Sequence, residues 1–356
     1  MESRMDTISY MSVPVPEGGA AVNVIAFGDC RDTMKEWAKH GIKAQTCVTS
    51  PPYFGLRDYG HSGQIGLEQT PEKYIAAMVD VFRCVRDVLA DDGTLWLNIG
   101  DSYASYRDGK ATPDSARGDS TGTLVPKGSA MNRMASTFAG SNVKHKDLIG
   151  IPWMLAFALR ADGWYLRQDI IWHKPNPMPE SVRDRCTKAH EYIFLLSKSD
   201  KYFFNNNAIK EPALWAHDKR AGKGRHTYRG KRQGRDGEGQ EAFVSITETR
   251  NRRSVWTVAT RPYKGAHFAT FPPSLIEPCI LAGSRAGDTV LDPFIGSGTT
   301  AEVSIRNHRK YLGCELNPDY GKMQQDRILN ANAVKCSKPR CKPQHLESHP
   351  GLFELA

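Results

Sequence analysis

The sequence of 356 residues contains no apolar run close to the ~20 residues that a membrane-spanning helix requires. Its most apolar stretch, Ile149 to Leu159, is about half that long. The first residues, MESRMDTISY, lack the charged, apolar and small-residue succession of a signal peptide. Eight cysteines are scattered along a long chain, which excludes a disulfide-stapled domain and favours a reducing compartment. We therefore expect a cytoplasmic protein with no membrane partner.

Acidic residues are outnumbered, with 39 Asp and Glu against 48 Lys and Arg and a net charge of +9. Most of the excess lies in residues 217–235, where a single acidic residue, Asp218, stands among eight basic ones. These are Lys219, Arg220, Lys223, Arg225, Arg229, Lys231, Arg232 and Arg235. Such a cationic segment fits a polyanion such as nucleic acid, because phosphate neutralisation supplies much of the affinity for it. A solvated basic loop is the alternative that charge alone leaves open.

Alternating strand and helix patterns predict an α/β fold with a mostly parallel sheet and helices on its faces. Strands are expected at 22–27, 43–50, 94–101, 165–174, 191–199, 289–294 and 311–316. A helix is expected to begin at Thr70-Pro71, because apolar residues then recur at three- and four-residue spacing up to Leu89. Further helices are expected at 148–161, at 273–284 and before the last strand. Two polar segments, near 101–147 and 205–262, interrupt this pattern.

A glycine-rich turn, Asp292 to Thr300, stands between a predicted strand and a predicted helix. It has no lysine, which argues against a phosphate loop, and it lacks the third glycine of a dinucleotide motif. The amino-acid half of S-adenosylmethionine carries no phosphate and suits such a turn. An acidic residue on the next strand, Glu315, would then hold the ribose hydroxyls. A purely structural tight turn is the alternative.

The segment Thr49-Ser50-Pro51-Pro52-Tyr53 ends another predicted strand. Consecutive prolines fix the backbone and supply no competing N–H donors. The Ser50 hydroxyl and the Pro51 carbonyl can therefore accept hydrogen bonds from one amino group, while Tyr53 stacks on a planar base. Such an amino group is a poor nucleophile, and two acceptors would hold it for in-line attack on a sulfonium methyl. An ordinary Pro-Pro turn is the alternative.

Together these motifs resemble the DNA amino-methyltransferases of the permuted, β-type order. The matching segments are GDC (28–30), TSPPYFGLRDYG (49–60), IIWHKPNPMPES with HEYIFLLSKS (170–199), and residues 271–300 continuing to GCELNPDY (313–320). The resemblance implies a Rossmann-like methyltransferase fold, S-adenosylmethionine as methyl donor and a base flipped out of double-stranded DNA. It implies base contacts from Ser50, Pro51, Pro52 and Tyr53. It implies cofactor contacts from Asp29, Asp292, Phe294, Gly296, Ser297, Gly298, Thr299 and Glu315.

The resemblance also divides the chain and assigns the basic residues of 217–235 to DNA contact. The expected parts are a catalytic half (20–100 and 148–204), a polar insertion expected to contact DNA (101–147), a basic target-recognition insertion (205–262), a cofactor-binding half (263–330) and a poorly ordered tail (331–356). A serine before Pro-Pro is usual in cytosine-N4 members of the family, whereas Asp or Asn is usual in adenine-N6 members. Ser50 therefore favours cytosine N4, with adenine N6 as the alternative.

Several further alternatives bear on function. RNA or protein methyltransferases share the cofactor half, but those with a Pro-Pro-Tyr motif have the opposite motif order. A non-enzymatic DNA-binding protein would explain the basic segment but not Ser50, the glycine-rich turn and Glu315 together. Cys279, which follows a proline as in carbon-5 cytosine methyltransferases, is expected to be a buried structural residue. No metal is expected, since Cys336, Cys341, His345 and His349 are too closely spaced for a standard zinc finger. The target sequence, a cognate restriction enzyme, and the choice between monomer and homodimer are left open.

Overall fold

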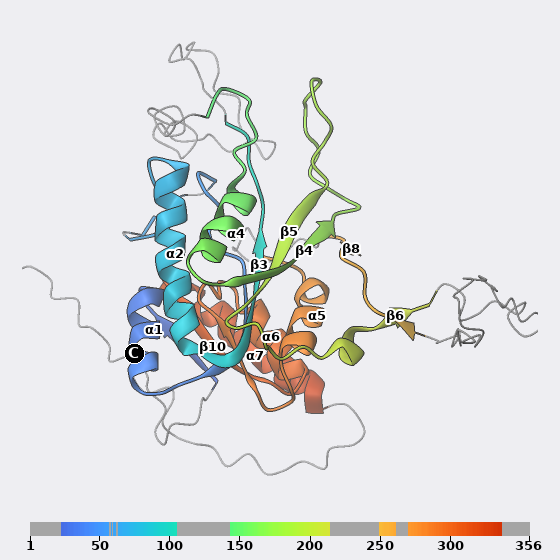
Figure 1. Ribbon diagram of the computed structural model, residues 1–356. Coiled ribbons are helices and arrows are strands. Elements are labelled where there is room, and N and C mark those ends of the chain that lie inside the picture. The colour runs from blue at the N-terminus through green and yellow to red at the C-terminus, as the bar shows by residue number, and fades with distance from the viewer. Residues whose placement is uncertain are drawn as a thin grey trace, which may run out of the picture.

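An eight-stranded sheet forms the centre of the protein (Figure 1). The computed structural model describes residues 23–104 apart from 57, 59 and 62, and residues 143–213, 249–260 and 270–336. The strand order is β1-β10-β9-β2-β3-β5-β4-β8. The strands of this sheet are β1 (Val24–Phe27), β2 (Ala44–Thr49), β3 (Leu89–Ile99), β4 (Tyr165–His173), β5 (His190–Ser197), β8 (Val255–Thr257), β9 (Thr289–Asp292) and β10 (Lys310–Glu315).

Helices cover both faces of this sheet. They are α1 (Cys30–Lys39), α2 (Pro71–Val88), α4 (Ile151–Ala161), α5 (Pro273–Gly283), α6 (Thr299–Arg306) and α7 (Gly321–Cys336). Short 3-10 turns occur at η1 (Asn206–Ile209) and η3 (Pro318–Tyr320), and β6 (Glu211–Pro212) pairs with β7 (Thr249–Arg250). Neighbouring strands from β1 to β3 are parallel, whereas β5 runs antiparallel to both β3 and β4. The predicted α/β fold with a mostly parallel sheet and helices on both faces is confirmed.

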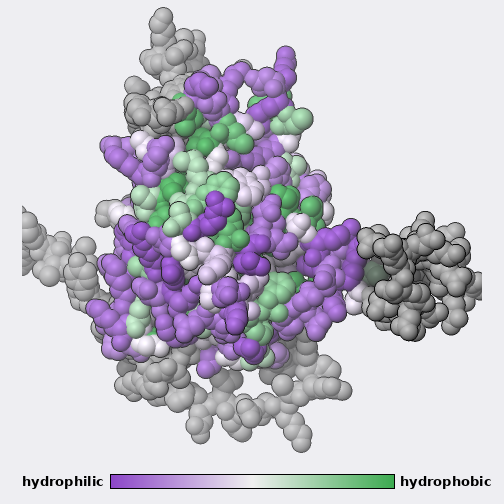
Figure 2. Space-filling view, viewed as in Figure 1, coloured by the Kyte–Doolittle hydropathy of each residue, from purple (hydrophilic) through white to green (hydrophobic). Residues whose placement is uncertain are grey.

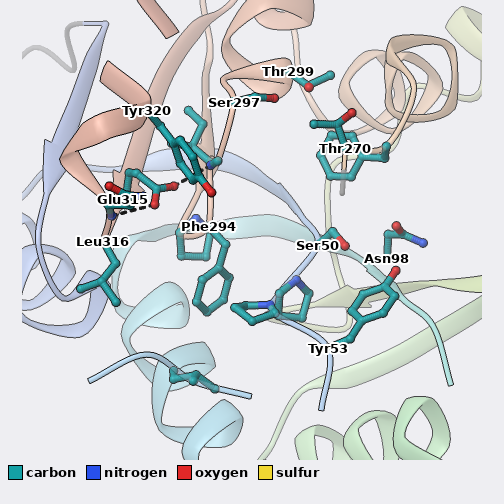
Figure 3. A pocket seen from close by; sticks show the side chains of 18 of the residues that line it. Ser50, Tyr53, Asn98, Thr270, Phe294, Ser297, Thr299, Glu315, Leu316 and Tyr320 are labelled. Carbon is teal, nitrogen blue, oxygen red and sulfur yellow. Dashed lines mark hydrogen bonds between the residues drawn. The ribbon is translucent and has the colours of Figure 1, made fainter. Parts of the chain in front are cut away.

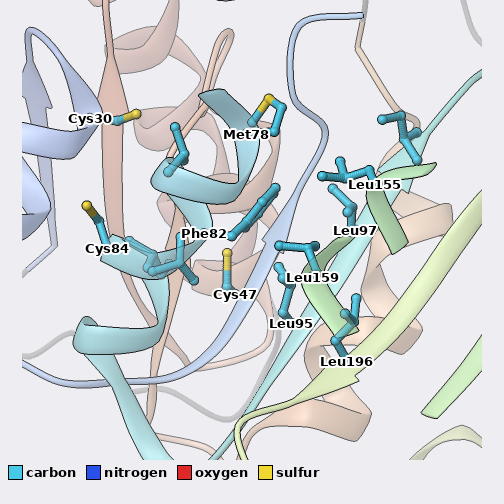
Figure 4. Close-up of a cluster of buried hydrophobic side chains, with 14 of the residues drawn as sticks. Cys30, Cys47, Met78, Phe82, Cys84, Leu95, Leu97, Leu155, Leu159 and Leu196 are labelled. Carbon is cyan, nitrogen blue, oxygen red and sulfur yellow. The ribbon is translucent and has the colours of Figure 1, made fainter. Parts of the chain in front are cut away.

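Alternate residues of the central strands supply two separate cores, as the two-residue period of a strand requires. Cys47, Leu95 and Leu97 pack with α1, α2 and α4, and Figure 4 shows them beside Phe82 and Leu159. The intervening residues face α5 and α6 on the other side of the sheet; these include Val48, Trp96, Ile193 and Leu195. Burial on both faces explains why these strands read as nearly continuous apolar runs.

Helix α2 begins as its sequence predicts. The Thr70 side chain accepts a hydrogen bond from the Lys73 N–H at 3.3 Å, and Pro71 occupies the first turn. Tyr74, Met78 and Phe82 are fully buried along one stripe of the helix. A fully buried large side chain contributes roughly 1.5–3 kcal/mol, so this stripe fixes α2 against the sheet.

The predicted recognition insertion and the predicted tail each contain part of the folded structure. Strand β8 lies within the predicted recognition insertion, yet it pairs in parallel with β4 and buries Trp256. Three residues are too few to show a strand period, so no strand was predicted there. Helix α7 continues to Cys336, six residues into the predicted tail. The basic residues between 217 and 235 lie outside the described residues, so their contact with DNA stays a prediction.

The surface seen in Figure 2 is mainly hydrophilic, and apolar side chains gather over the region of α4. Leu148, just before this helix, and Phe157 within it are each nearly half exposed. Among the described residues, none of the helices combines the length and apolar character needed to cross a membrane.

Candidate active site

The carboxyl ends of the parallel strands meet at one edge of the sheet. From β9 the chain continues to the neighbouring β10, whereas from β2 it continues to β3 on the other side. The chain direction therefore diverges between β9 and β2, which is where open α/β sheets bind ligands. Because β5 is antiparallel, its first residues, His190 and Glu191, lie at this same edge.

A cavity of about 770 Å³ opens at this edge. The structure brings nearly all the predicted catalytic and cofactor-binding residues into its lining, although they come from opposite ends of the sequence. They are Asp29, Ser50, Pro51, Pro52, Tyr53, Phe294, Gly296, Ser297, Thr299 and Glu315. Figure 3 shows one group, around Glu315 and Phe294, and another around Ser50 and Tyr53. Two predicted residues of the glycine-rich turn, Asp292 and Gly298, are not part of the lining.

The glycine-rich turn owes its shape to positive backbone φ angles. Gly296 has φ 51° and Gly298 has φ 84°, values that other L-residues rarely adopt. Gly298 is the N-cap of α6, and no side chain caps this helix. The turn is held from α7, where Gln324 Nε2 donates to the Gly296 carbonyl at 2.7 Å. Arg327 donates to Ser297 Oγ at 2.9 Å and to Thr299 Oγ1.

Glu315, at the end of β10, accepts hydrogen bonds from two backbone N–H groups. Its Oε2 accepts the Gly296 N–H and its Oε1 accepts the Asn317 N–H, each at 2.9 Å. Burial raises the pKa of this carboxyl, and these backbone hydrogen bonds oppose the rise. Each carboxylate oxygen keeps lone-pair capacity beyond its one backbone bond, so Glu315 can still accept from hydroxyl groups of a ligand.

Asp29 caps helix α1 at this edge of the sheet. It is the N-cap of α1 and accepts the Arg31 N–H at 2.8 Å, while the Arg31 guanidinium also donates to its carboxylate. Burial acts to raise the pKa of Asp29, but the hydrogen bonds and charge of Arg31 outweigh it and the net shift is downward. The carboxylate therefore stays ionised beside the cavity, where it lines the wall next to Gly28 and Cys30.

Asp292 links the two predicted motifs. It is almost fully buried, and its Oδ1 accepts the Thr49 hydroxyl at 2.6 Å and the Phe294 N–H at 3.0 Å. Its Oδ2 accepts the Thr300 hydroxyl at 2.6 Å. Burial raises the pKa of Asp292 to about 6 against these hydrogen bonds. Asp292 thus joins the residue before Ser50 to the glycine-rich turn.

The Pro-Pro turn is fixed from α2 and from β5. Tyr74 Oη donates to the Pro52 carbonyl at 2.9 Å, and Tyr53 Oη donates to Glu191 Oε2 at 2.7 Å. The Tyr53 ring lies directly against Gly100, where an added Cβ would come within 2.7 Å of Tyr53 Cε2. Tyr53 therefore has a fixed ring position and a hydroxyl that is already engaged.

Sequence reasoning missed a polar cluster beside Tyr53. Glu191 accepts from Asn98 Nδ2 at 3.3 Å and forms an ion pair with Lys174, and all three side chains line the cavity. Lys174 also lies over the Trp172 ring, 4.3 Å from its centroid. The available signal was a polar residue at the end of an apolar run in each of two strands, with Asn98 after Leu95 to Leu97 and Glu191 before Tyr192 to Leu196.

Cys279 takes no part in the cavity. It is buried in α5, its thiol is directed to the Leu275 carbonyl at 3.8 Å, and burial raises its pKa. The expectation of a structural cysteine is confirmed. In the described part of the chain, no three His, Cys, Asp or Glu side chains are grouped as a metal site would require. Cys341, His345 and His349 lie outside that part.

Comparison with known proteins now identifies the family. The model of a DNA methylase family, the N6/N4 methyltransferases, matches residues 44–326. The type II methyltransferase M.SmaI of Serratia marcescens is 48% identical over 308 residues, which cover 86% of this chain and 90% of the relative. M.XycI of Xanthomonas campestris pv. cyanopsidis is 48% identical over 306 residues, covering 86% and 87%.

Solved structures agree on the fold. PvuII DNA methyltransferase (cytosine-N4-specific) has a TM-score of 0.54 at 16% identity, covering 89% of this chain and 91% of its own. TTHA0409 of Thermus thermophilus, a modification methylase solved with S-adenosyl-L-methionine, has a TM-score of 0.51 at 20% identity, covering 87% and 94%. The Rossmann-like methyltransferase fold is confirmed. The chain belongs to the N6/N4 family of DNA methylases and is an S-adenosylmethionine-dependent DNA amino-methyltransferase.

Proposed function

We propose that this protein methylates the N4 amino group of a cytosine that is flipped out of double-stranded DNA. The observation that carries the choice of base is the serine at position 50, directly before Pro51-Pro52 at the cavity. Within the N6/N4 family, serine at this position is usual in the cytosine-N4 enzymes. PvuII methyltransferase, which shares the fold, is itself described as cytosine-N4-specific, which favours the same choice.

The cofactor side of the cavity suits S-adenosylmethionine. Glu315 offers a partly buried carboxylate with spare lone pairs for the two ribose hydroxyls, and Asp29 lies on the wall where the adenine ring would fit. Phe294 supplies an apolar surface, while Gly296 and Ser297 allow the backbone to approach the methionine half. When bound there, the cofactor supplies an electrophilic methyl carbon.

The base side must present an amino group to that carbon. The Ser50 hydroxyl and the Pro51 carbonyl would accept the two amino hydrogens and orient the nitrogen lone pair. The Tyr53 ring, held by Gly100 and Glu191, would stack on the base. Preorganised acceptors and a fixed ring reduce the entropy that the base loses on docking.

DNA binding would involve the basic segment. We propose that Lys219, Arg220, Lys223, Arg225, Arg229, Lys231, Arg232 and Arg235 contact phosphates of the duplex from the recognition insertion. The relatives' designation as type II methyltransferases favours a companion restriction endonuclease that recognises the same DNA sequence.

The test is nucleoside mass spectrometry of plasmid and genomic DNA after incubation with the protein and methyl-labelled S-adenosylmethionine. We expect labelled N4-methylcytosine from the wild type and none from Ser50→Ala, with cofactor binding kept in a thermal-shift assay. Ser199→Ala is the matched control, because Ser199 follows β5 at the opposite edge of the sheet and bonds only backbone carbonyls in the described structure.

Two results would refute this assignment. Labelled N6-methyladenine would keep the family and the cofactor but exclude cytosine as the target. Full activity of Ser50→Ala would remove Ser50 from the base site.

A further inference from the structure

Met178 is an exposed apolar residue at the opening of the cavity. Its side chain is 81% exposed, the highest value among the exposed large hydrophobic residues of the described chain, yet it forms part of the cavity lining. Among the described residues, Leu56 is the one other member of that exposed group in the lining. A single exposed apolar side chain needs no explanation by itself, so the position and the support of Met178 decide whether it has a function.

The segment that carries Met178 begins beside the proposed base site. It connects β4 to β5, and Figure 1 shows this connection extending beyond the sheet. At its start, Lys174 forms an ion pair with Glu191, which accepts the hydrogen of the Tyr53 hydroxyl. Met178 follows Lys174 by four positions and lines the same cavity, so the chain reaches Met178 from the base side.

Alternating prolines restrict the backbone around Met178. Pro175, Pro177 and Pro179 each have a fixed φ angle, and each also restricts the residue before it to extended conformations. Because Met178 lies between two of these prolines, its own backbone is restricted as well. A segment of this kind loses little conformational entropy when it docks against a partner.

Hydrogen bonds fix this segment on both sides of Met178. On one side, the Asn176 side chain donates to the Thr260 carbonyl at 3.1 Å and accepts the Thr260 N–H at 2.9 Å. On the other side, Glu180 accepts a hydrogen bond from the Arg185 guanidinium at 2.5 Å. The protein thus presents an exposed apolar side chain on a fixed backbone at the cavity opening.

The connection between β4 and β5 is also basic. Residues 174–189 contain four basic side chains and two acidic ones, and Arg183 is exposed. Basic side chains on this segment attract DNA phosphates and would bring Met178 up to the duplex. An apolar side chain on a basic segment therefore fits a duplex better than it fits an apolar protein partner.

A base that leaves the duplex creates a space in the stack. The enzyme must offset the cost of unstacking and unpairing that base. Proteins that open base steps frequently insert an apolar side chain between the bases, and methionine is one of the residues used. Methionine is unbranched and polarizable, so it can enter a narrow gap and make favourable contacts with aromatic rings.

We propose that Met178 enters the duplex and fills the space left by the flipped-out base. Met178 is then a positioning residue, because it stabilises the extruded state of the DNA and does not touch the reacting atoms. This inference rests on the proposed function, and it applies whether the target base is cytosine or adenine.

The first test compares substitutions of Met178 on an unmodified duplex. The target site is mapped by sequencing plasmid DNA that the wild type has methylated, and an oligonucleotide duplex with that site is prepared. Single-turnover transfer from tritiated-methyl S-adenosylmethionine is then measured with the enzyme in excess. Met178→Ala should be slower than the wild type by about tenfold, because the unstacking cost is no longer offset. Met178→Leu keeps the apolar volume and should stay within about threefold of the wild type.

A second duplex separates gap filling from any other effect of the substitution. In this duplex a pyrene nucleotide replaces the base opposite the target, and its large flat ring fills the space in the stack. Met178→Ala and the wild type should then differ by less than about threefold, because the ring replaces the missing side chain. If pyrene does not restore the rate of Met178→Ala relative to the wild type, the proposal is overturned.

Two further variants serve as controls. Leu329→Ala removes a 66% exposed leucine from α7 outside the cavity lining, and its rate should equal that of the wild type on both duplexes. Leu56→Ala removes the other exposed apolar side chain of the lining. A slow Leu56→Ala that pyrene restores, together with an unaffected Met178→Ala, would assign the gap to Leu56 and overturn the proposal.

The remaining outcomes concern binding and the proposed function. Cofactor binding, followed by the thermal shift, should be the same in Met178→Ala and the wild type. A weaker affinity for the cofactor would place Met178 against the cofactor and overturn the proposal. The same holds for a Met178→Ala rate within about threefold of the wild type on the unmodified duplex. A wild type that labels no DNA would instead refute the proposed function, and the role of Met178 with it.

Discussion

Burial of Asp292 should make the stability of the protein fall as pH rises, and Asp292→Asn should remove this dependence. Asp292 has its pKa raised by burial from an ordinary value of 3.8 to about 6. A carboxyl whose pKa is higher in the folded state favours folding when protonated. Its contribution is therefore complete below about pH 4 and is lost as pH rises through about 6.

The size of this stability change follows from the difference between the two pKa values of Asp292. About two pKa units, at 1.36 kcal/mol per unit, correspond to about 3 kcal/mol over the whole range. Roughly half of this, ~1.4 kcal/mol, falls between pH 5 and pH 8. Asparagine cannot ionise and can be accommodated, because Thr300 Oγ1 also lies 3.5 Å from the Val48 carbonyl. Thr300 can then donate to that carbonyl and accept from the new amide.

The assay is urea unfolding followed by tryptophan fluorescence at several pH values from 5 to 8. We expect the free energy of unfolding of the wild type, relative to that of Asp292→Asn, to decrease by ~1.4 kcal/mol across this range. Thr49→Val, which removes one hydrogen bond that lowers the pKa, should move the midpoint above 6. Parallel pH profiles for the wild type and Asp292→Asn would refute the reasoning.

Two further predictions concern methyl transfer and DNA affinity. Gly100→Ala places a Cβ within 2.7 Å of the tyrosine ring at the base site, so methyl transfer should fall at least tenfold while cofactor binding persists. Single-turnover labelling and a thermal-shift titration measure the two effects, and unchanged labelling would contradict the ring position. Replacing Arg229, Lys231 and Arg232 by glutamine should reduce the slope of log K against log salt by ~2.7 if all three contact phosphates. An unchanged slope in a fluorescence-anisotropy titration would exclude them from the interface.

The sequence predicted those parts of the site whose residues are adjacent along the chain. Ser50 to Tyr53 and the glycine-rich turn are recognisable because a short segment carries each function. Asn98 lies on β3, Glu191 on β5 and Lys174 directly after β4, and only the sheet register brings them together. The Thr49–Asp292 hydrogen bond joins residues 243 positions apart, a contact that no local pattern can reveal.

The length of an element decided whether it could be predicted from the sequence. Long amphipathic or apolar segments such as α2 and β5 have enough residues to show a period, and their positions were predicted well. Strand β8 has only three residues and is defined by its pairing with β4. Its membership of the sheet depends on a partner 84 positions away in sequence, which the local pattern does not contain.

The β6–β7 pair affects how the segment between its two strands can change in length. Glu211 pairs with Arg250 across these strands and also with Arg253, so the two ends of the intervening chain are clasped together. A loop that leaves and re-enters a scaffold at one point can change in length at a small entropic cost, about 0.6 kcal/mol per doubling. The β6–β7 pair, with the ion pairs of Glu211, is therefore a suitable site for loop exchange. A recognition loop from another enzyme could be inserted there without changing the strands that position the methylation site.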